Sequence, residues 1–145
     1  MMTILRNILA IIVGLAVGGG VNMSLIVVGP YLIPAPAGVD VTDAQSLSIS
    51  MHLFRPEHFV FPFLAHALGT LAGALVAFLI AASYRPAFAY AVGVVFLAGG
   101  IAATFMIPAP IWFIALDLAI AYIPMAWLGI EIGRRINKGA AVIAG

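Results

Sequence analysis

The stretch HFVFPFLAHALGTLAGALVAFLIAAS, residues His58 to Ser83, decides the fold class of this chain. It exceeds the roughly 20 apolar residues that a helix needs to cross a bilayer, and it contains no Asp, Glu, Lys or Arg. His66 is the one ionisable residue inside its apolar run, and Gly69 and Gly73 follow at GxxxG spacing. The stretch therefore predicts a membrane-spanning helix with one polar position in its outer part.

The composition of the whole chain agrees with a membrane setting. Hydrophobic residues make up 65% of the sequence and charged residues only 8%, whereas soluble domains average about 45–50% and about 25%. A net charge of +1 without a basic stripe argues against a nucleic-acid partner. The absence of cysteine excludes disulfides, thiolate metal sites and cysteine nucleophiles.

Three further apolar segments have the length of a spanning helix. The four expected helices cover residues 7–29, 58–83, 87–107 and 111–133 of a single transmembrane domain, 1–145. The connections at 84–86 and 108–110 are short, so the helices that they join should run in opposite directions. The expected fold is an all-α membrane protein, a four-helix antiparallel bundle.

The positive charges predict the orientation of these helices. With four spans, both termini and the 84–86 connection lie on one side of the membrane. That side carries five of the six Lys and Arg residues, namely Arg6, Arg85, Arg134, Arg135 and Lys138. The positive-inside rule therefore places both termini in the cytoplasm.

The only sizeable loop, residues 30–57, lies on the outer side in this orientation. Its first part is rich in Pro and Gly, and Thr42 or Asp43 can then cap a short helix over about 43–54. Leu47, Met51 and Phe54 fall on one face of that helix. The pattern predicts an amphipathic helix that lies on lipid or covers the outer end of the bundle as a lid.

Pairs of glycines at GxxxG spacing occur three times: Gly14/Gly18, Gly69/Gly73 and Gly129/Gly133. Glycines one turn apart let two helix backbones approach closely, which is a main source of helix association in lipid. Packing within the chain explains these pairs without a dimer. Contact with another membrane protein or a second copy through the same faces stays open.

Ionisable residues inside a span are costly, about 2.5–3.5 kcal/mol for an Asp at the helix centre on insertion scales. The rise per residue puts His66 roughly 12 Å, Asp117 roughly 9 Å and Asn22 roughly 10 Å below the outer ends of their expected helices. Thr104 lies somewhat shallower and Tyr122 deeper. Because an isolated polar group in hydrocarbon is unfavourable, residues at one level should contact each other.

An Asp117–His66 hydrogen bond would keep the carboxylate charged or let the pair share a proton, whereas without a partner burial would favour neutral Asp117. One interpretation is a purely structural hydrogen-bond cluster. Another is a ligand site, for which the candidates are Asn22, His66, Thr104, Asp117 and Tyr122. A third has His66 or Asp117 simply reaching the outer headgroup region.

Metal and cofactor sites find less support. His52, Glu57 and His58 lie close in sequence, and imidazole with carboxylate suits zinc or another divalent ion. No HxxxH, HExxH or HxH spacing is present, however, and loop histidines are usually solvated. We expect no cofactor, because a haem between helices would need two axial histidines at matching depth and His66 is the only deep one.

The run Ser50 to Ser83 resembles a group of uncharacterised small bacterial four-helix membrane proteins, and the resemblance extends to Ile107–Gly129. The resemblance implies a bacterial inner-membrane setting and transfers no activity. Small multidrug exporters, in contrast, keep a Glu in the first helix. Here Asn22 and Ser24 are the polar residues in the outer half of that segment.

Three functions follow as hypotheses. The first is a non-enzymatic protein that binds or moves a small molecule or ion through an outward-facing polar cavity. The second is an accessory or assembly subunit of a larger membrane complex, with a structural polar cluster. The third, an intramembrane enzyme with His66 and Asp117 as an acid/base pair, has the least support, because the sequence supplies no other catalytic component.

Overall fold

The computed structural model describes residues 1–143, and this part of the chain is helical without strands. Four helical stretches are long and apolar enough to span a membrane, and they cover Met2–Leu32, Pro56–Ile80, Arg85–Met106 and Ile111–Gly139. The predicted set of four long apolar helices is therefore confirmed. Their boundaries differ from the expected ones by up to a few residues at most ends.

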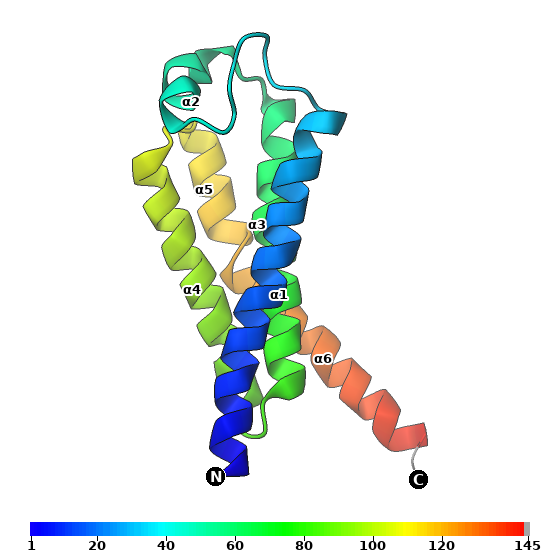
Figure 1. Cartoon of the computed structure of the whole chain (residues 1–145). Helices are drawn as coiled ribbons and strands as arrows, with labels where there is room; N and C mark the ends of the chain where they lie inside the picture. The colour runs from blue at the N-terminus through cyan, green and yellow to red at the C-terminus, as the bar shows by residue number, and fades with distance from the viewer. Residues whose placement is uncertain (144–145) are drawn as a thin grey trace.

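The helical elements in chain order are α1 (Met2–Leu32), α2 (Ala44–Ser50), η1 (Met51–Leu53), η2 (Pro56–Phe59), α3 (Val60–Ile80), α4 (Arg85–Met106), α5 (Ile111–Ile120) and α6 (Ile123–Ile143). Figure 1 shows that α1 begins and α6 ends at one end of the molecule, which we call the termini end. Residues 33–59 lie at the opposite end, which we call the loop end.

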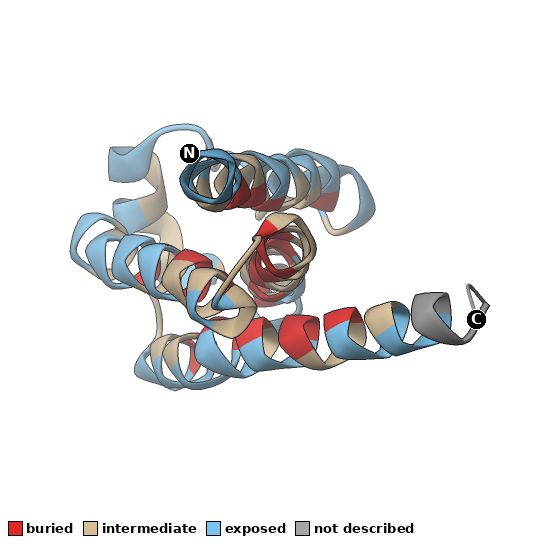
Figure 2. Ribbon diagram, turned by 90° about the horizontal axis from the view of Figure 1, so that it is seen from below, coloured by how far each residue is buried: buried red, intermediate tan, exposed pale blue. Residues whose placement is uncertain are grey.

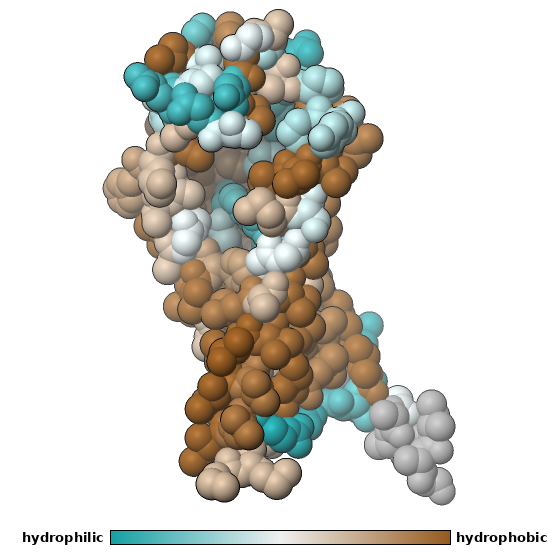
Figure 3. Space-filling view, in the orientation of Figure 1, coloured by the Kyte–Doolittle hydropathy of each residue, from teal (hydrophilic) through white to brown (hydrophobic). Residues whose placement is uncertain are grey.

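Helix α3 is the central element, in contact with α1, α4, α5 and α6. Seen from the termini end, its ribbon is surrounded by the other long helices and carries much of the buried surface (Figure 2). The core that it forms is built from small side chains, including the fully buried Ala65, Ala74 and Ala77. The outward faces of the helices are apolar and exposed instead (Figure 3), as lipid contact would require.

Glycines join α1 to α3 in two reciprocal contacts. A Cβ atom on Gly14 would lie 2.8 Å from the Gly73 carbonyl oxygen, and one on Gly73 would lie 2.7 Å from the Gly14 oxygen. Gly18 and Gly69 form the same arrangement, at 2.7 and 2.8 Å. Two of the GxxxG pairs thus pack directly on each other. Glycine is needed at these positions, since a side chain in either pair would force the two backbones apart.

The third GxxxG pair joins α6 to α3. A Cβ atom on Gly129 would lie 2.9 Å from the Leu71 carbonyl oxygen, and one on Gly133 would overlap the Phe78 ring. All three pairs therefore pack inside the chain.

The expected fourth helix, 111–133, is not continuous. It is divided into α5 and α6 by a turn at Ala121 and Tyr122. Pro124 explains the break, because its ring nitrogen has no hydrogen to donate to the Ile120 carbonyl. The backbone bonds flanking the turn run from the Ala121 N–H to the Asp117 oxygen, 2.9 Å, and from the Ala126 N–H to the Tyr122 oxygen, 2.8 Å. The fourth predicted span is therefore present as two consecutive helices.

The other helix boundaries shift for local reasons. Helix α1 continues through Pro30 to Leu32, whereas α3 ends at Ile80, three residues before the expected end. At that end the Arg6 guanidinium donates to the Ile80 carbonyl, 3.0 Å, and the Asn7 side-chain oxygen accepts from the Ala82 N–H, 2.9 Å. Side chains of α1 thus satisfy backbone groups that the end of α3 leaves free.

The loop contains the short helix α2, whose N-cap is Asp43: its carboxylate accepts a 2.7 Å hydrogen bond from the Ser46 N–H. The α-helical part ends at Ser50 and continues as the 3₁₀ turn η1, so it is shorter than the expected 43–54. Nearby, hydrogen bonds from the Thr42 hydroxyl and backbone N–H lower the pKa of Asp40 below its ordinary value.

Candidate functional site

Asp117 is the centre of a buried polar cluster. Its Oδ1 lies 2.9 Å from His66 Nδ1, and its Oδ2 accepts a 2.7 Å hydrogen bond from the Tyr122 hydroxyl. The side chain of Asp117 is 7% exposed and that of His66 is 24% exposed. The hydrogen bond predicted between Asp117 and His66 is therefore present, and Tyr122 joins the same carboxylate.

The break between α5 and α6 positions Tyr122 in this cluster. The Tyr122 ring is 1% exposed and stacks on the His66 imidazole at a centroid distance of 5.8 Å. Its hydroxyl occupies space that Gly100 of α4 leaves free, since a Cβ atom there would overlap the hydroxyl oxygen. Three helices thus determine the position of one phenol group.

The fully buried polar atoms of the cluster all have hydrogen-bond partners. The Thr70 hydroxyl donates to the His66 carbonyl, 2.8 Å, one turn back along α3. Among the described residues, every fully buried side-chain nitrogen or oxygen has a hydrogen-bond partner. His66 is partly exposed, and its Nε2 has no partner in the described part of the chain, so this atom can still bind something else.

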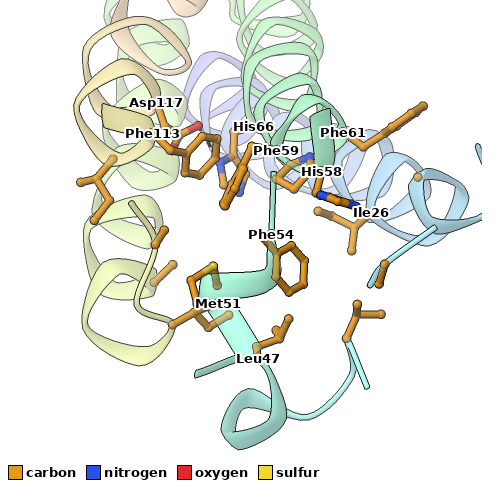
Figure 4. A pocket seen from close by; sticks show the side chains of 18 of the residues that line it. Ile26, Leu47, Met51, Phe54, His58, Phe59, Phe61, His66, Phe113 and Asp117 are labelled. Carbon is orange, nitrogen blue, oxygen red and sulfur yellow. Dashed lines mark hydrogen bonds and ion pairs between the residues drawn. The ribbon is translucent and has the colours of Figure 1, made fainter. Parts of the chain in front are cut away.

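A cavity of about 310 Å³ adjoins the cluster on the side of the loop end. Its polar lining residues are His58, His66, Thr104 and Asp117, and the remaining lining is apolar or glycine. In Figure 4, Leu47, Met51 and Phe54 lie across the cavity from His66 and Asp117. The cavity is thus largely apolar, with His66 and Asp117 at its inner end and His58 at the loop end, which differs from the polar cavity expected from the sequence.

Aromatic side chains line much of the wall. Phe59 packs against Phe113 at a centroid distance of 4.8 Å, and Phe54 packs edge-on to His58 at 5.4 Å. Phe61 completes the aromatic part of the lining. An apolar, aromatic wall with a few polar groups is typical of small-molecule sites, whose volumes run from about 300 to 1,000 Å³.

The structure separates the remaining sequence candidates. Thr104 lines the cavity, and its hydroxyl donates to the Ile101 carbonyl at 2.7 Å. Asn22 does not line it and makes no side-chain hydrogen bond within the described residues. Its Cβ instead lies 3.0 Å from the Cβ position of Gly69, in the contact between α1 and α3. Asn22 therefore lies in the contact between α1 and α3 and not in the cluster with His66 and Asp117, where the sequence predicted it.

The three weak metal candidates are engaged elsewhere. His52 Nδ1 lies 3.1 Å from the Ile49 carbonyl oxygen, and His58 Nδ1 accepts from the Arg55 N–H at 2.9 Å. Glu57 forms a 2.8 Å ion pair with Arg55. Within residues 1–143, no group of three or more His, Asp or Glu side chains could hold a metal ion.

Three features of the site were not predicted from the sequence. The first is the space at Gly100, because no sequence pattern pairs this glycine with Tyr122. The second is the helix break at Ala121 and Tyr122. Its signal in the sequence was Pro124, two residues after Tyr122. The aromatic wall was also missed, because aromatic residues in apolar segments are usually ordinary packing.

The contribution of the phenol can be measured separately. Replacing Tyr122 by phenylalanine removes one donor to Asp117 and keeps the ring, so we expect a loss of about 1 kcal/mol in the free energy of unfolding. Tyr90→Phe is the matched control, since Tyr90 is half-buried against the core and its hydroxyl makes no hydrogen bond in the described structure. Equal losses in an SDS titration would contradict this role.

Comparison with known proteins finds no matching family model, no similar curated protein and no similar solved structure.

Proposed function

We propose that this chain is a multi-pass protein of the bacterial inner membrane, folded as an antiparallel four-helix bundle with both termini in the cytoplasm. Four apolar helices, the distribution of Lys and Arg, and the resemblance noted above support this setting. The pairing of Gly14 with Gly73 and of Gly18 with Gly69 supports opposite directions for α1 and α3. In this arrangement the loop end faces outward, and α2 is an amphipathic helix at the outer surface.

Its function, in this proposal, is to bind or move a small molecule in the cavity, without catalysing a reaction. The observation that carries the proposal is the cavity of about 310 Å³ with His66 and Asp117 at its inner end. Asp117 and Tyr122 hold the imidazole, and His66 Nε2 contacts the ligand. Leu47, Met51 and Phe54 then act as a lid.

The broken helix is a second support for binding. Discontinuous membrane helices form the substrate sites of many transporters, because the interrupted backbone leaves polar groups near the membrane midplane. Here the interruption at Ala121–Tyr122 directly follows the turn of α5 that carries Asp117. A continuous helix would place Tyr122 differently relative to that carboxylate.

One observation favours a second function, that of an accessory or assembly subunit. Fully buried polar side-chain atoms in the described part of the chain are all hydrogen-bonded, so the cluster can serve structure alone. The partner would then bind through the apolar outer faces, since the GxxxG pairs are occupied inside the chain. The cavity has no role in this alternative.

Thermal unfolding of the full chain in lipid nanodiscs, against a panel of ions, amino acids, amines and apolar alcohols, separates the two functions. A true ligand at a hundredfold excess over its Kd stabilises the chain by about 2.7 kcal/mol. That stabilisation is expected to disappear in His66→Ala and in Asp117→Asn. It should persist in His52→Ala, which removes a histidine that does not line the cavity.

Stabilisation that all three variants retain would place the ligand elsewhere. If no compound stabilises the wild type and both cavity variants are simply less stable, the accessory function is supported instead.

A further inference from the structure

The cavity has an opening on the side of the molecule, between α1 and α4. These helices contact each other in the termini-end half, where Gly14 meets Val92 and Gly18 meets the Phe96 ring. Toward the loop end they diverge (Figure 1), and residues of both helices line the cavity there. Figure 3 shows a hollow on this face in the upper half, with hydrophilic atoms in its depth. We call this hollow the lateral opening.

The rim of the lateral opening is apolar. Ile26 of α1 and Ala103 of α4 line the cavity near this face, and both belong to helices apolar enough to span a membrane. Met106, one turn from Ala103 on the same side of α4, is apolar and 70% exposed. In the proposed membrane arrangement, this rim faces lipid rather than water.

The loop end offers a less direct route from water. Val41, Leu47, Met51 and Phe54 line the cavity at that end, so apolar side chains lie between it and the loop surface. A polar solute would have to pass these groups and lose its hydration. A molecule already dissolved in the bilayer meets no such barrier at the lateral opening.

The inner end determines what the head of such a molecule must be. In the neutral tautomer that donates its Nδ1 proton to Asp117, Nε2 of His66 is a hydrogen-bond acceptor. Both Asp117 oxygens already have donors, from His66 and Tyr122. The available atom therefore selects a donor, and a neutral hydroxyl suits a molecule that must partition into hydrocarbon, where a cation would be costly.

We propose that the cavity takes a membrane-dissolved apolar alcohol, which enters from the bilayer between α1 and α4 and donates its hydroxyl proton to His66 Nε2. This inference rests on the proposed binding function and names its ligand class. The aromatic side chains of the wall pack against the hydrocarbon part of the alcohol, and the His66 imidazole accepts the hydrogen bond from its hydroxyl.

Farnesol is a suitable probe, with farnesyl methyl ether as its matched control, because the ether keeps the apolar chain and lacks the donor. Affinities for the full chain in nanodiscs can be measured by the shift in thermal stability. We expect the ether to bind about tenfold more weakly, which corresponds to the loss of one hydrogen bond of about 1.4 kcal/mol. Equal affinities for the alcohol and the ether would overturn the assignment of the head.

The route is tested by narrowing the lateral opening. Ala103→Trp from α4 and Ile26→Trp from α1 each add a large ring at the rim, and we expect farnesol to associate with either variant about tenfold more slowly. Val94→Trp is the control, since Val94 is an exposed residue of α4 roughly 15 Å further toward the termini end. Two rim variants guard against one that fails to fold.

An unchanged rate of farnesol association in both rim variants would overturn the lateral route. A water-soluble compound that binds through His66 while farnesol does not would overturn this inference and leave the proposed function standing. If no compound of either kind shows an effect that depends on His66, the proposed function itself fails.

Discussion

Replacing Asp117 by alanine is expected to cost about 3 kcal/mol in the free energy of unfolding, the largest effect of any polar substitution in the chain. The carboxylate accepts hydrogen bonds from His66 and from Tyr122, and its side chain is 7% exposed. Alanine leaves both donors without an acceptor in a region of low dielectric constant, and each such loss costs about 1–3 kcal/mol. An SDS titration of the full chain in detergent micelles measures the change.

A double-mutant cycle with His66→Ala distinguishes a cluster from two independent residues. Because the two side chains share one hydrogen bond, the double variant should be more stable than the sum of the single losses predicts, by about 1 kcal/mol. Asp40→Ala is the control for removing a carboxylate, since Asp40 lies in the exposed loop. Strict additivity of Asp117→Ala and His66→Ala would contradict the contact.

Replacing Gly18 by alanine is expected to destabilise the chain by about 2 kcal/mol, although alanine is the better helix former. The added Cβ atom would lie 2.7 Å from the Gly69 carbonyl oxygen and 2.8 Å from the Phe96 ring. A backbone oxygen in the middle of α3 cannot move away without separating the two helices. The contact of α1 with α3 and with α4 should therefore weaken together.

Gly20→Ala is the matched control, because it makes the same substitution in the same helix at a position with no atom within 4 Å of the added Cβ. We expect this variant to be unchanged or more stable by up to about 1 kcal/mol. The same SDS titration compares the two. Equal effects of Gly18→Ala and Gly20→Ala would mean that the reciprocal glycine contacts do not hold α1 against α3.

The sequence alone predicted the four long apolar helices, because each is an uninterrupted run of the length that a bilayer needs. It also predicted the Asp117–His66 hydrogen bond, since two ionisable groups at one level in hydrocarbon have few other partners. The depth of a residue, however, gives only its level along the helix and not the neighbouring helix that its side chain faces. Asn22 has the expected depth but lies in the contact of α1 with Gly69, which depended on how the helices pack.

The hydrophobic pattern of the sequence did not predict which helices pack together or where a helix is interrupted. GxxxG spacing predicts a close approach but not which helix approaches, so the pairing of Gly14 with Gly73 could not be read from sequence. The break at Tyr122 depended on one proline, which membrane helices often tolerate, as α1 tolerates Pro30. The cavity could not be predicted either, because its existence depends on helix packing. It forms at the loop end, where α1 and α4 diverge beyond their closely packed halves.

In the proposed function, a small molecule contacts His66 Nε2 while Asp117 accepts a hydrogen bond from Nδ1 of the same ring. Nitrogen-15 NMR of histidine-labelled chain in nanodiscs tests it directly, with His66→Gln to assign the signal among the three histidines. We expect a His66 tautomer with the proton on Nδ1 and an Nε2 resonance that shifts on titration with farnesol. A proton fixed on Nε2 alone, together with a resonance unaffected by farnesol and by every compound of the panel, would contradict it.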